Sequence, residues 1–154
     1  FLLVGDGVEK TKLKQLAEQK QLCNVRFEGF IGRNVYPDLL KICSLGLVCL
    51  SPQNQTPVVP GKILGYMAAG LPVVAFLQSQ SDGHAIVQAA QCGVTADSAD
   101  LDACVEAFQA MLKQAVTFEA IGAAGKHYAI KHFSKEACVT RMERMLTGVK
   151  ETSK

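Results

Sequence analysis

Short apolar runs alternate along the chain with longer segments in which apolar residues recur at helical spacing. The apolar runs predict β-strands, and the run LGLVCL at residues 45–50 is typical of a strand covered on both faces. Strands are expected at residues 2–4, 25–27, 45–50, 73–77 and 93–94. Helices are expected at residues 9–22, 37–43, 61–69, 83–91, 101–115, 118–132 and 135–150.

This alternation with short loops predicts an α/β fold, a doubly wound, Rossmann-like parallel sheet in which the strand at residues 2–4 is buried. After Thr117 the strands stop and two extra C-terminal helices follow, the second of them capped by Ser134. The helix at residues 101–115 is expected to face the core with Leu101, Val105, Phe108 and Leu112. Because ligands of such sheets bind at the carboxyl ends of the strands, the loops of interest are residues 5–8, 28–35, 51–61 and 78–83.

Composition narrows the possible functions. A chain of 154 residues, 49% of them hydrophobic, is long enough for one domain with a core. Its 16 Lys and Arg residues nearly balance its 14 Asp and Glu residues, and no basic face or tryptophan platform suggests nucleic-acid binding. Neither an apolar run of about 18 residues, which a membrane-spanning helix needs, nor a secretory signal is recognised.

The cysteines and histidines do not form clusters. The six cysteines include no CxxC pair, and no combination with the three histidines has the spacing of zinc ligands. Neither a metal site nor a cofactor is therefore expected. Most of the cysteines stand inside apolar runs, where a reduced thiol packs as a small apolar side chain. Buried thiols in a reducing, cytoplasmic compartment are the expectation.

One candidate motif is Gly5-Asp6-Gly7, which follows the first predicted strand. Its two glycines let the backbone turn sharply and approach a ligand closely. A plain tight turn is the alternative, and the motif alone does not decide between the two.

A second motif extends from Pro60 to Val74 and joins a helix start to a buried strand. Backbone N–H groups at a helix start favour an anion, and the helix dipole strengthens the effect. Gly61 leaves room where a phosphate would press, and Lys62 adds a neutralising charge. The alternative is an ordinary helix with Lys62 in solvent, and the motif supports both interpretations equally.

Taken together, FLLVGDG, NVRFEGFI, PDLLKICSLGLVCLSP and PGKILGYMAAGLPVVAF resemble, in this order, the C-terminal lobe of the group 1 glycosyltransferases. The tail KHYAIKHFSKEACVTRMERML is similar to the helices that close that lobe. The family is glycogen-synthase-like, with the GT-B fold and a retaining mechanism. The resemblance implies a single lobe over residues 1–154 that binds a nucleotide-diphosphate sugar. The sugar would pass to a glycan or lipid-linked acceptor in polysaccharide or lipopolysaccharide biosynthesis.

The same resemblance implies a donor site. The loop that carries Phe30, Ile31 and Arg33 would flank the nucleotide base, although an exposed arginine is the alternative for Arg33. The N–H groups at the start of the helix at residues 61–69 would face the diphosphate, with no metal in the chemical step. The residues expected to bind the donor are Gly5, Asp6, Gly7, Phe30, Ile31, Arg33, Pro60, Gly61, Lys62, Ile63 and Gly65.

The chain departs from the family pattern in two respects. Members carry two glutamates that touch sugar and ribose, and the matching positions here, Pro57 and Gly65, supply no carboxylate. The family's lobe also begins one strand and helix earlier, with an Arg and a Lys that grip the diphosphate. Without that central strand of the order 3-2-1-4-5-6, the strands at residues 2–4 and 45–50 are expected to pair with each other or to keep open edges.

These departures keep alternatives open. The chain alone is expected to bind donor weakly and to transfer nothing, because the acceptor and most catalytic groups would come from an N-terminal lobe. A non-catalytic α/β module that has lost its site is the second hypothesis, and an epimerase, which would need paired carboxylates, ranks last.

Two smaller features also have two interpretations each. Asp82-Gly83-His84 would contact the sugar or form a helix N-cap. The basic group on the helix at residues 118–132 would be a solvated face or a peripheral contact with anionic lipid; it comprises Lys126, His127, Lys131 and His132.

Overall fold

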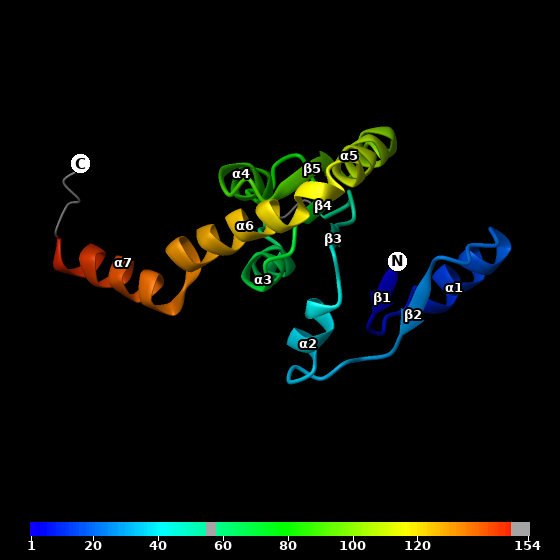
Figure 1. The fold of residues 1–154 in the computed structure, drawn as a ribbon, viewed down its shortest axis with the longest axis horizontal. Coiled ribbons are helices and arrows are strands. Elements are labelled where there is room, and N and C mark those ends of the chain that lie inside the picture. Colours follow the sequence, from blue (N-terminus) through cyan, green and yellow to red (C-terminus); the bar gives the residue numbers. More distant parts are fainter. Residues whose placement is uncertain (55–57, 149–154) are drawn as a thin grey trace. The chain divides into compact units, whose positions relative to one another are not determined.

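Each apolar run that predicts a strand forms one in the computed structural model, which describes residues 1–54 and 58–148 (Figure 1). The chain divides into two compact units, Phe1–Leu39 and Leu40–Lys154. A short helix, α2 (Tyr36–Lys41), spans the division between them. The α/β class is confirmed, with every described strand in a parallel pair.

The first unit is a two-stranded parallel sheet with one long helix. It consists of β1 (Leu2–Val4), α1 (Lys10–Gln19) and β2 (Arg26–Glu28). Leu2 lies beside Arg26 and Val4 beside Glu28. The prediction of a buried strand at residues 2–4 is wrong, because all three residues of β1 are exposed and α1 buries none of its own. A strand is buried only when both its faces are covered, and this small unit supplies one helix.

The second unit is built on a three-stranded parallel sheet in the order β3-β4-β5. The strands are β3 (Gly46–Cys49), β4 (Val73–Leu77) and β5 (Gly93–Asp97). The helices are α3 (Gly61–Ala69), α4 (Gly83–Ala89), α5 (Leu101–Lys113), α6 (Phe118–Phe133) and α7 (Lys135–Thr147), with a short 3₁₀ turn at Ala115–Thr117. The predicted bounds of α3 and β4 are confirmed to the residue.

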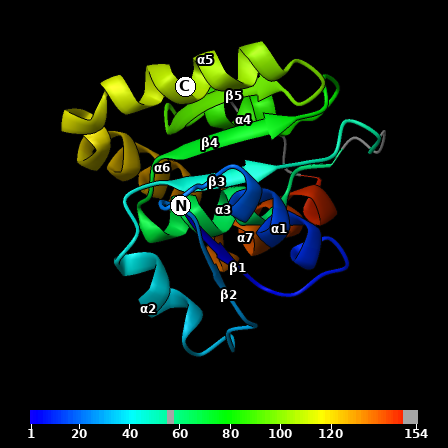
Figure 2. The ribbon, with the colours of Figure 1, turned by 90° about the vertical axis from the view of Figure 1, so that its right-hand side faces the viewer.

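Both faces of this sheet are covered by helices (Figure 2). Alternate residues of β4, including Val73 and Leu77, pack with Ile63 and Met67 of α3 and Val87 of α4. α5 covers the other face, where Cys104 and Met111 are its buried residues. The central strand β4 is therefore enclosed on both sides, as its uninterrupted apolar run predicts.

Three of the four residues of the apolar stripe predicted for α5 miss the sheet by about one helical position, whereas the fourth, Phe108, is half-buried. Leu101, Val105 and Leu112 are 76%, 47% and 50% exposed, whereas Cys104 and Met111 face the sheet. The apolar arc of α5 is wider than the strip that the sheet can cover, so the tertiary contact selects one edge of it.

Glycines bring α6 close to the rest of the second unit. A Cβ atom on Gly122 would lie 2.0 Å from the carbonyl oxygen of Gly70, so only hydrogen fits between α6 and the end of α3.

The last helix, α7, begins as predicted, because the Ser134 hydroxyl accepts a 3.1 Å hydrogen bond from the N–H of Ala137. α7 ends at Thr147 and Gly148 adopts the left-handed conformation; positions 149–150 of the predicted helix lie outside the described residues.

Two expectations about edges and thiols are settled by the fold. In the described part of the chain β1 pairs only with β2 and β3 only with β4, so the open-edge alternative is confirmed. The expectation of buried thiols is correct for Cys92 and Cys104 and wrong for the three exposed cysteines, which are Cys23, Cys49 and Cys138. Cys138 lies on α7, a helix that packs too lightly to bury any residue.

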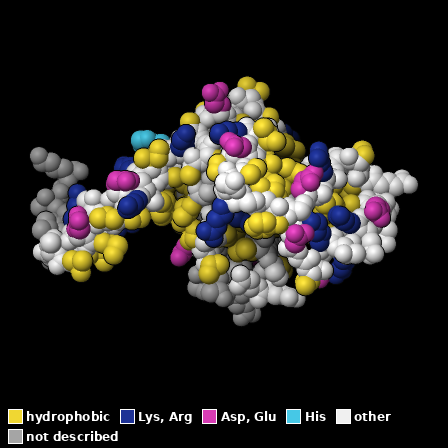
Figure 3. Space-filling view, turned by 90° about the horizontal axis from the view of Figure 1, so that it is seen from below, with side chains coloured by type: hydrophobic (Ala, Val, Ile, Leu, Met, Phe, Trp, Pro, Cys, Tyr) yellow, Lys and Arg dark blue, Asp and Glu magenta, His cyan; other side chains and the backbone are white. Residues whose placement is uncertain are grey.

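The surface carries charges of both signs. On the face seen in Figure 3, Lys and Arg side chains are interspersed with Asp and Glu side chains among apolar ones. Across residues 1–54 and 58–148, no helix has the length and apolar character that a membrane crossing requires.

Candidate functional site

The start of α3 is the candidate site in the second unit. Because β3, β4 and β5 are parallel, their carboxyl ends share one edge of the sheet, and α3 begins at that edge with Gly61. No side chain caps this helix start. The N–H of Ile63 donates a 2.9 Å hydrogen bond to the carbonyl of Pro60. Among the described residues, the backbone N–H groups of Gly61 and Lys62 have no partner, so they are the two amides left for a ligand.

Lys62 places a positive charge beside these amides. Its side chain is exposed. Cys49, at the end of β3, is exposed as a residue, but partial desolvation of its sulfur raises the pKa of the thiol, and the nearby ammonium of Lys62 partly offsets that increase. The lysine charge therefore acts at the carboxyl edge of the sheet.

The surroundings of α3 leave space on its exposed side. A Cβ atom on Gly61 or on Gly65 would meet no atom within 4 Å. Two positions at which the family has glutamate are Gly65 and Pro57 in this chain. Gly65 lies in this open space, and Pro57 lies outside the described residues.

Ser81 holds the segment that leads into α3, a role that the sequence analysis missed. Its buried hydroxyl donates a 2.7 Å hydrogen bond to the carbonyl of Val58 and accepts one of 3.2 Å from the N–H of Gly83. The N-cap interpretation of Asp82-Gly83-His84 needs correction, because the Asp82 side chain makes no capping hydrogen bond and Ser81 serves the helix start instead. A serine in the loop after a strand, directly before Asp-Gly, was the available signal.

His84 has partners for both ring nitrogens. Nδ1 lies 2.8 Å from the hydroxyl of Thr95, and Nε2 lies 3.2 Å from the carbonyl oxygen of Gln78. A carbonyl oxygen only accepts, so Nε2 carries a hydrogen. These contacts favour a structural role for His84 over contact with a sugar.

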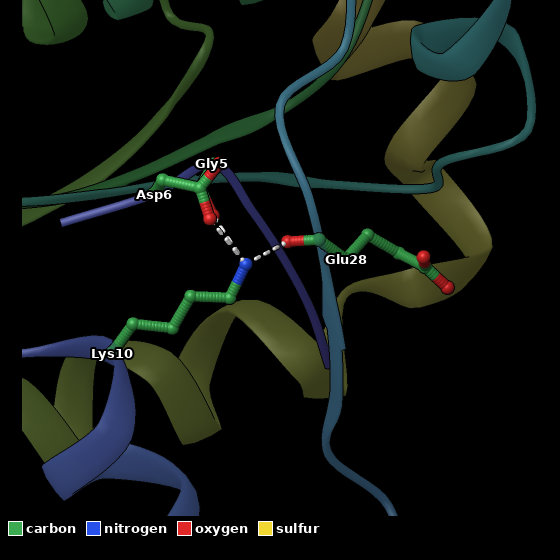
Figure 4. A network of polar contacts seen from close by, with 4 residues as sticks. All are labelled: Gly5, Asp6, Lys10 and Glu28. Atoms are coloured by element: carbon green, nitrogen blue, oxygen red, sulfur yellow. Dashed lines mark hydrogen bonds and ion pairs between the residues drawn. The ribbon is translucent and has the colours of Figure 1, made fainter.

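A separate candidate site lies in the first unit, at the ends of β1 and β2. Figure 4 shows the ammonium of Lys10 between Gly5, Asp6 and Glu28. Its Nζ atom lies 2.8 Å from the Gly5 carbonyl, 2.7 Å from Asp6 Oδ1 and 2.8 Å from the Glu28 carbonyl. Nothing in the sequence singled out Lys10, although its spacing of four residues from Asp6 is that of a helical ion pair.

Asp6 joins this network to the next loop. The hydrogen bond and positive charge of Lys10 lower the pKa of the Asp6 carboxyl, and a hydrogen bond from the backbone N–H of Phe30 lowers it further. The structure thus brings Gly5, Asp6 and Phe30 of the predicted set together. Phe30 is 78% exposed, Ile31 is half-buried and Arg33 is exposed.

The predicted donor residues divide between the two units. Those up to Arg33 belong to the first unit, and those from Pro60 to Gly65 belong to the second. Within residues 1–54 and 58–148, no group of three or more His, Cys, Asp or Glu side chains could hold a metal ion.

Comparisons with known proteins agree with this architecture. The family model described as glycosyl transferases group 1 matches residues 1–114. The putative colanic acid biosynthesis glycosyl transferase WcaI of Escherichia coli K12 is 26% identical over 140 residues, which are 88% of this chain and 33% of that protein. The chain therefore spans about a third of the length of this curated relative.

A solved structure shows the same fold. Sucrose-phosphate synthase from Thermosynechococcus elongatus matches 96% of this chain and 38% of its own, with a TM-score of 0.75 and 22% identity. The expected GT-B, Rossmann-like arrangement is thereby confirmed. With three quarters of its length matched by one family model, the chain belongs to the group 1 glycosyltransferase family.

Proposed function

We propose that this chain is the donor-binding lobe of a retaining glycosyltransferase that uses a nucleotide-diphosphate sugar. The observation that carries the proposal is the start of α3, where two backbone amides without a partner among the described residues lie beside the exposed Lys62. A diphosphate fits this group because it brings negative charge and several hydrogen-bond acceptors to one place.

The chemistry that this arrangement supports is electrostatic. As the bond between the anomeric carbon and the diphosphate oxygen breaks, negative charge grows on the departing nucleoside diphosphate. The N–H groups of Gly61 and Lys62, the dipole of α3 and the Lys62 ammonium would stabilise that charge. Because the charge is larger in the transition state than in the bound donor, the same groups would raise the rate and not only the affinity. No metal is required for this step.

The loops of the first unit would recognise the nucleoside. The exposed ring of Phe30 and the backbone of Ile31 would contact the base, with Arg33 available to base or phosphate. Gly5 and Gly7, on either side of Asp6, would let the backbone approach the ligand closely.

The acceptor and the remaining catalytic groups would come from an N-terminal lobe of the same enzyme. Membership of the family and the name of WcaI, a protein of colanic acid biosynthesis, support transfer to a glycan or lipid-linked acceptor during polysaccharide or lipopolysaccharide biosynthesis. The enzyme would act in the cytoplasm. The exposed Lys126, His127 and Lys131 of α6, with His132, would provide peripheral contact with anionic lipid.

Replacement of Lys62 in the full-length enzyme tests the proposal. Lys62→Ala should lower kcat/KM for the donor by the equivalent of about 1–3 kcal/mol, because one charged hydrogen-bond donor is lost. Lys113→Ala is a matched control, since Lys113 lies in the last turn of α5, away from the start of α3. Unchanged kinetics for Lys62→Ala would remove the start of α3 from the donor site.

The second candidate is a non-catalytic α/β module that has lost its site, and the absence of a carboxylate at Gly65 favours it. Calorimetric titration of the full-length protein with UDP-, GDP- and ADP-sugars separates the two. Saturable heat from one of them supports the transferase, whereas none from any supports the module.

A further inference from the structure

A half-buried ammonium at the ends of β1 and β2 has all its hydrogen-bonding capacity in use. The three N–H donors of a lysine ammonium match the three acceptors around Lys10 Nζ, which lie within 2.8 Å. The Lys10 side chain is only 22% exposed, although it belongs to the first turn of a surface helix. A solvated lysine would keep its donors in water, so these contacts fix its position.

The three acceptors belong to two different loops. The Gly5 carbonyl directly follows β1 and begins the Gly5-Asp6-Gly7 turn. The Glu28 carbonyl ends β2, immediately before the loop that carries Phe30. Glu28 also accepts a 3.4 Å hydrogen bond from the N–H of Gly5, so the two loop starts are joined both directly and through Lys10.

We propose that Lys10 is a positioning residue for base recognition, whose ammonium holds the turn at residues 5–7 and the loop at residues 28–33 in the arrangement that receives the nucleoside. The inference rests on the proposed function, because it assigns both loops to the donor. It adds a residue on α1 that need not contact the donor itself.

The physical reason is preorganisation. Gly5 has φ +131°, a conformation that side chains rarely adopt, and a turn with two glycines has many alternative conformations in the absence of a tie. Asp6 extends this network from the turn at residues 5–7 to the loop that carries Phe30, since its carboxylate accepts hydrogen bonds from Lys10 and from the Phe30 N–H. Loops ordered before binding lose less entropy when the nucleoside binds, so donor affinity rises without any new contact.

The geometry also requires a lysine. The three acceptors surround a single nitrogen atom, which the compact ammonium can serve from one point. An arginine presents its donors in a planar fork, which suits a carboxylate but not two backbone carbonyls on either side. A methionine of similar length would leave the Gly5 and Glu28 carbonyls without this donor.

The test compares Lys10→Met with Lys12→Met in the full-length enzyme. Lys12 lies on the same helix and pairs with Glu9, but its side chain is 80% exposed and touches neither loop. Lys10→Met should raise KM for the donor about tenfold, the equivalent of about 1.4 kcal/mol, and leave kcat within about twofold. The preference among UDP-, GDP- and ADP-sugars should also become weaker. Lys12→Met should change none of these quantities.

The outcomes separate this inference from the proposed function. If Lys62→Ala impairs donor use while Lys10→Met leaves both KM and base preference unchanged, Lys10 is not a positioning residue and the donor site stands. If Lys62→Ala has no effect, the proposed function itself fails. A purely structural Lys10 would lower thermal stability and kcat without altering base preference.

A second variant, Lys10→Arg, tests the same inference if Lys10→Met does not fold. Lys10→Arg keeps the positive charge and the pair with Asp6, so the protein should fold. A raised KM with unchanged kcat in Lys10→Arg would support the inference, and wild-type KM with wild-type base preference would overturn it.

Discussion

The hydroxyl of Ser81 donates a hydrogen bond of 2.7 Å to the carbonyl oxygen of Val58, 23 residues earlier in the chain. This bond ties the segment that enters α3 to the loop that enters α4. Because Ser81 is only 5% exposed, neither the Val58 carbonyl nor the Gly83 N–H can readily exchange it for water. The start of α3, on which the proposed donor site depends, is thus held from a different part of the chain.

Removal of the Ser81 hydroxyl should therefore destabilise the protein. Ser81→Ala leaves two polar groups of the backbone without a partner, and the expected loss is about 1–3 kcal/mol in the free energy of unfolding. Ser51→Ala is the control, because the Ser51 hydroxyl accepts one exposed hydrogen bond, from the N–H of Gln53. Urea denaturation of both variants measures the difference, and equal unfolding midpoints would show that the Ser81 bonds carry no net stability.

Two glycines should respond to alanine in opposite directions. Gly122→Ala places a Cβ atom 2.0 Å from the Gly70 carbonyl oxygen, so α6 must move and stability should fall by at least about 1–3 kcal/mol. Gly65→Ala meets no atom within 4 Å in the interior of α3 and should be neutral or stabilising by up to about 1 kcal/mol. Thermal unfolding of the two variants gives the comparison, and a Gly122→Ala protein as stable as the wild type would disprove the close contact.

The carboxyl of Asp6 should report the state of the Lys10 network. Lys10 lowers the Asp6 pKa below its ordinary value of 3.8, so Lys10→Met should return it toward that value. Lys14→Met should shift it less, because Lys14 is the weakest of the contributing charges. An NMR titration of the Asp6 side chain measures its pKa in the wild type, in Lys10→Met and in Lys14→Met. An unchanged pKa in Lys10→Met would contradict the ion pair.

The same shift gives a pH dependence with a definite sign. A carboxyl whose pKa is lower in the folded state stabilises the protein above the pKa of the unfolded state, and this contribution is lost as the pH falls through the folded pKa. Wild-type stability should therefore decrease more steeply below about pH 4 than that of Lys10→Met.

Cys92 should produce the opposite dependence at high pH. Burial raises the pKa of its thiol from 9.0 to about 11, so the unfolded chain loses this proton first. Stability should accordingly fall as the pH rises from about 9 to about 11. Cys92→Ala should flatten that slope, and Cys138→Ala, which alters an exposed thiol, should not. Urea denaturation at several alkaline pH values tests this, and identical slopes for Cys92→Ala and the wild type would contradict it.

The sequence predicted where strands form better than it predicted whether they are buried. Val73–Leu77 is apolar at every position, with Gly-Leu-Pro before it and a polar loop after it. Both ends of this strand were therefore predicted to the residue. In the first unit the same kind of run, Leu2–Val4, forms the predicted strand but is exposed. Apolar character identified a strand in both places, whereas burial depended on how many helices and strands surround it.

The candidate site divides in the same way. The glycine turn at residues 5–7 and the Pro60-Gly61-Lys62 helix start are local features, because residue type and spacing set their backbone conformation. Lys10 and Ser81 act through the carbonyls of Glu28 and Val58, which are 18 and 23 residues away in the chain, so no motif reveals them. Distances of this kind arise only when the strands pair.

Residue pattern alone was enough for the alternation of strands and helices, the α/β class and the family, since each follows from short segments read in order. Packing decided the rest: which edge of the apolar arc of α5 meets the sheet, which thiols are buried, and which side chains anchor the loops. The physical reason is that burial and hydrogen bonding are properties of neighbours in space, and neighbours far apart in the chain are chosen by the fold.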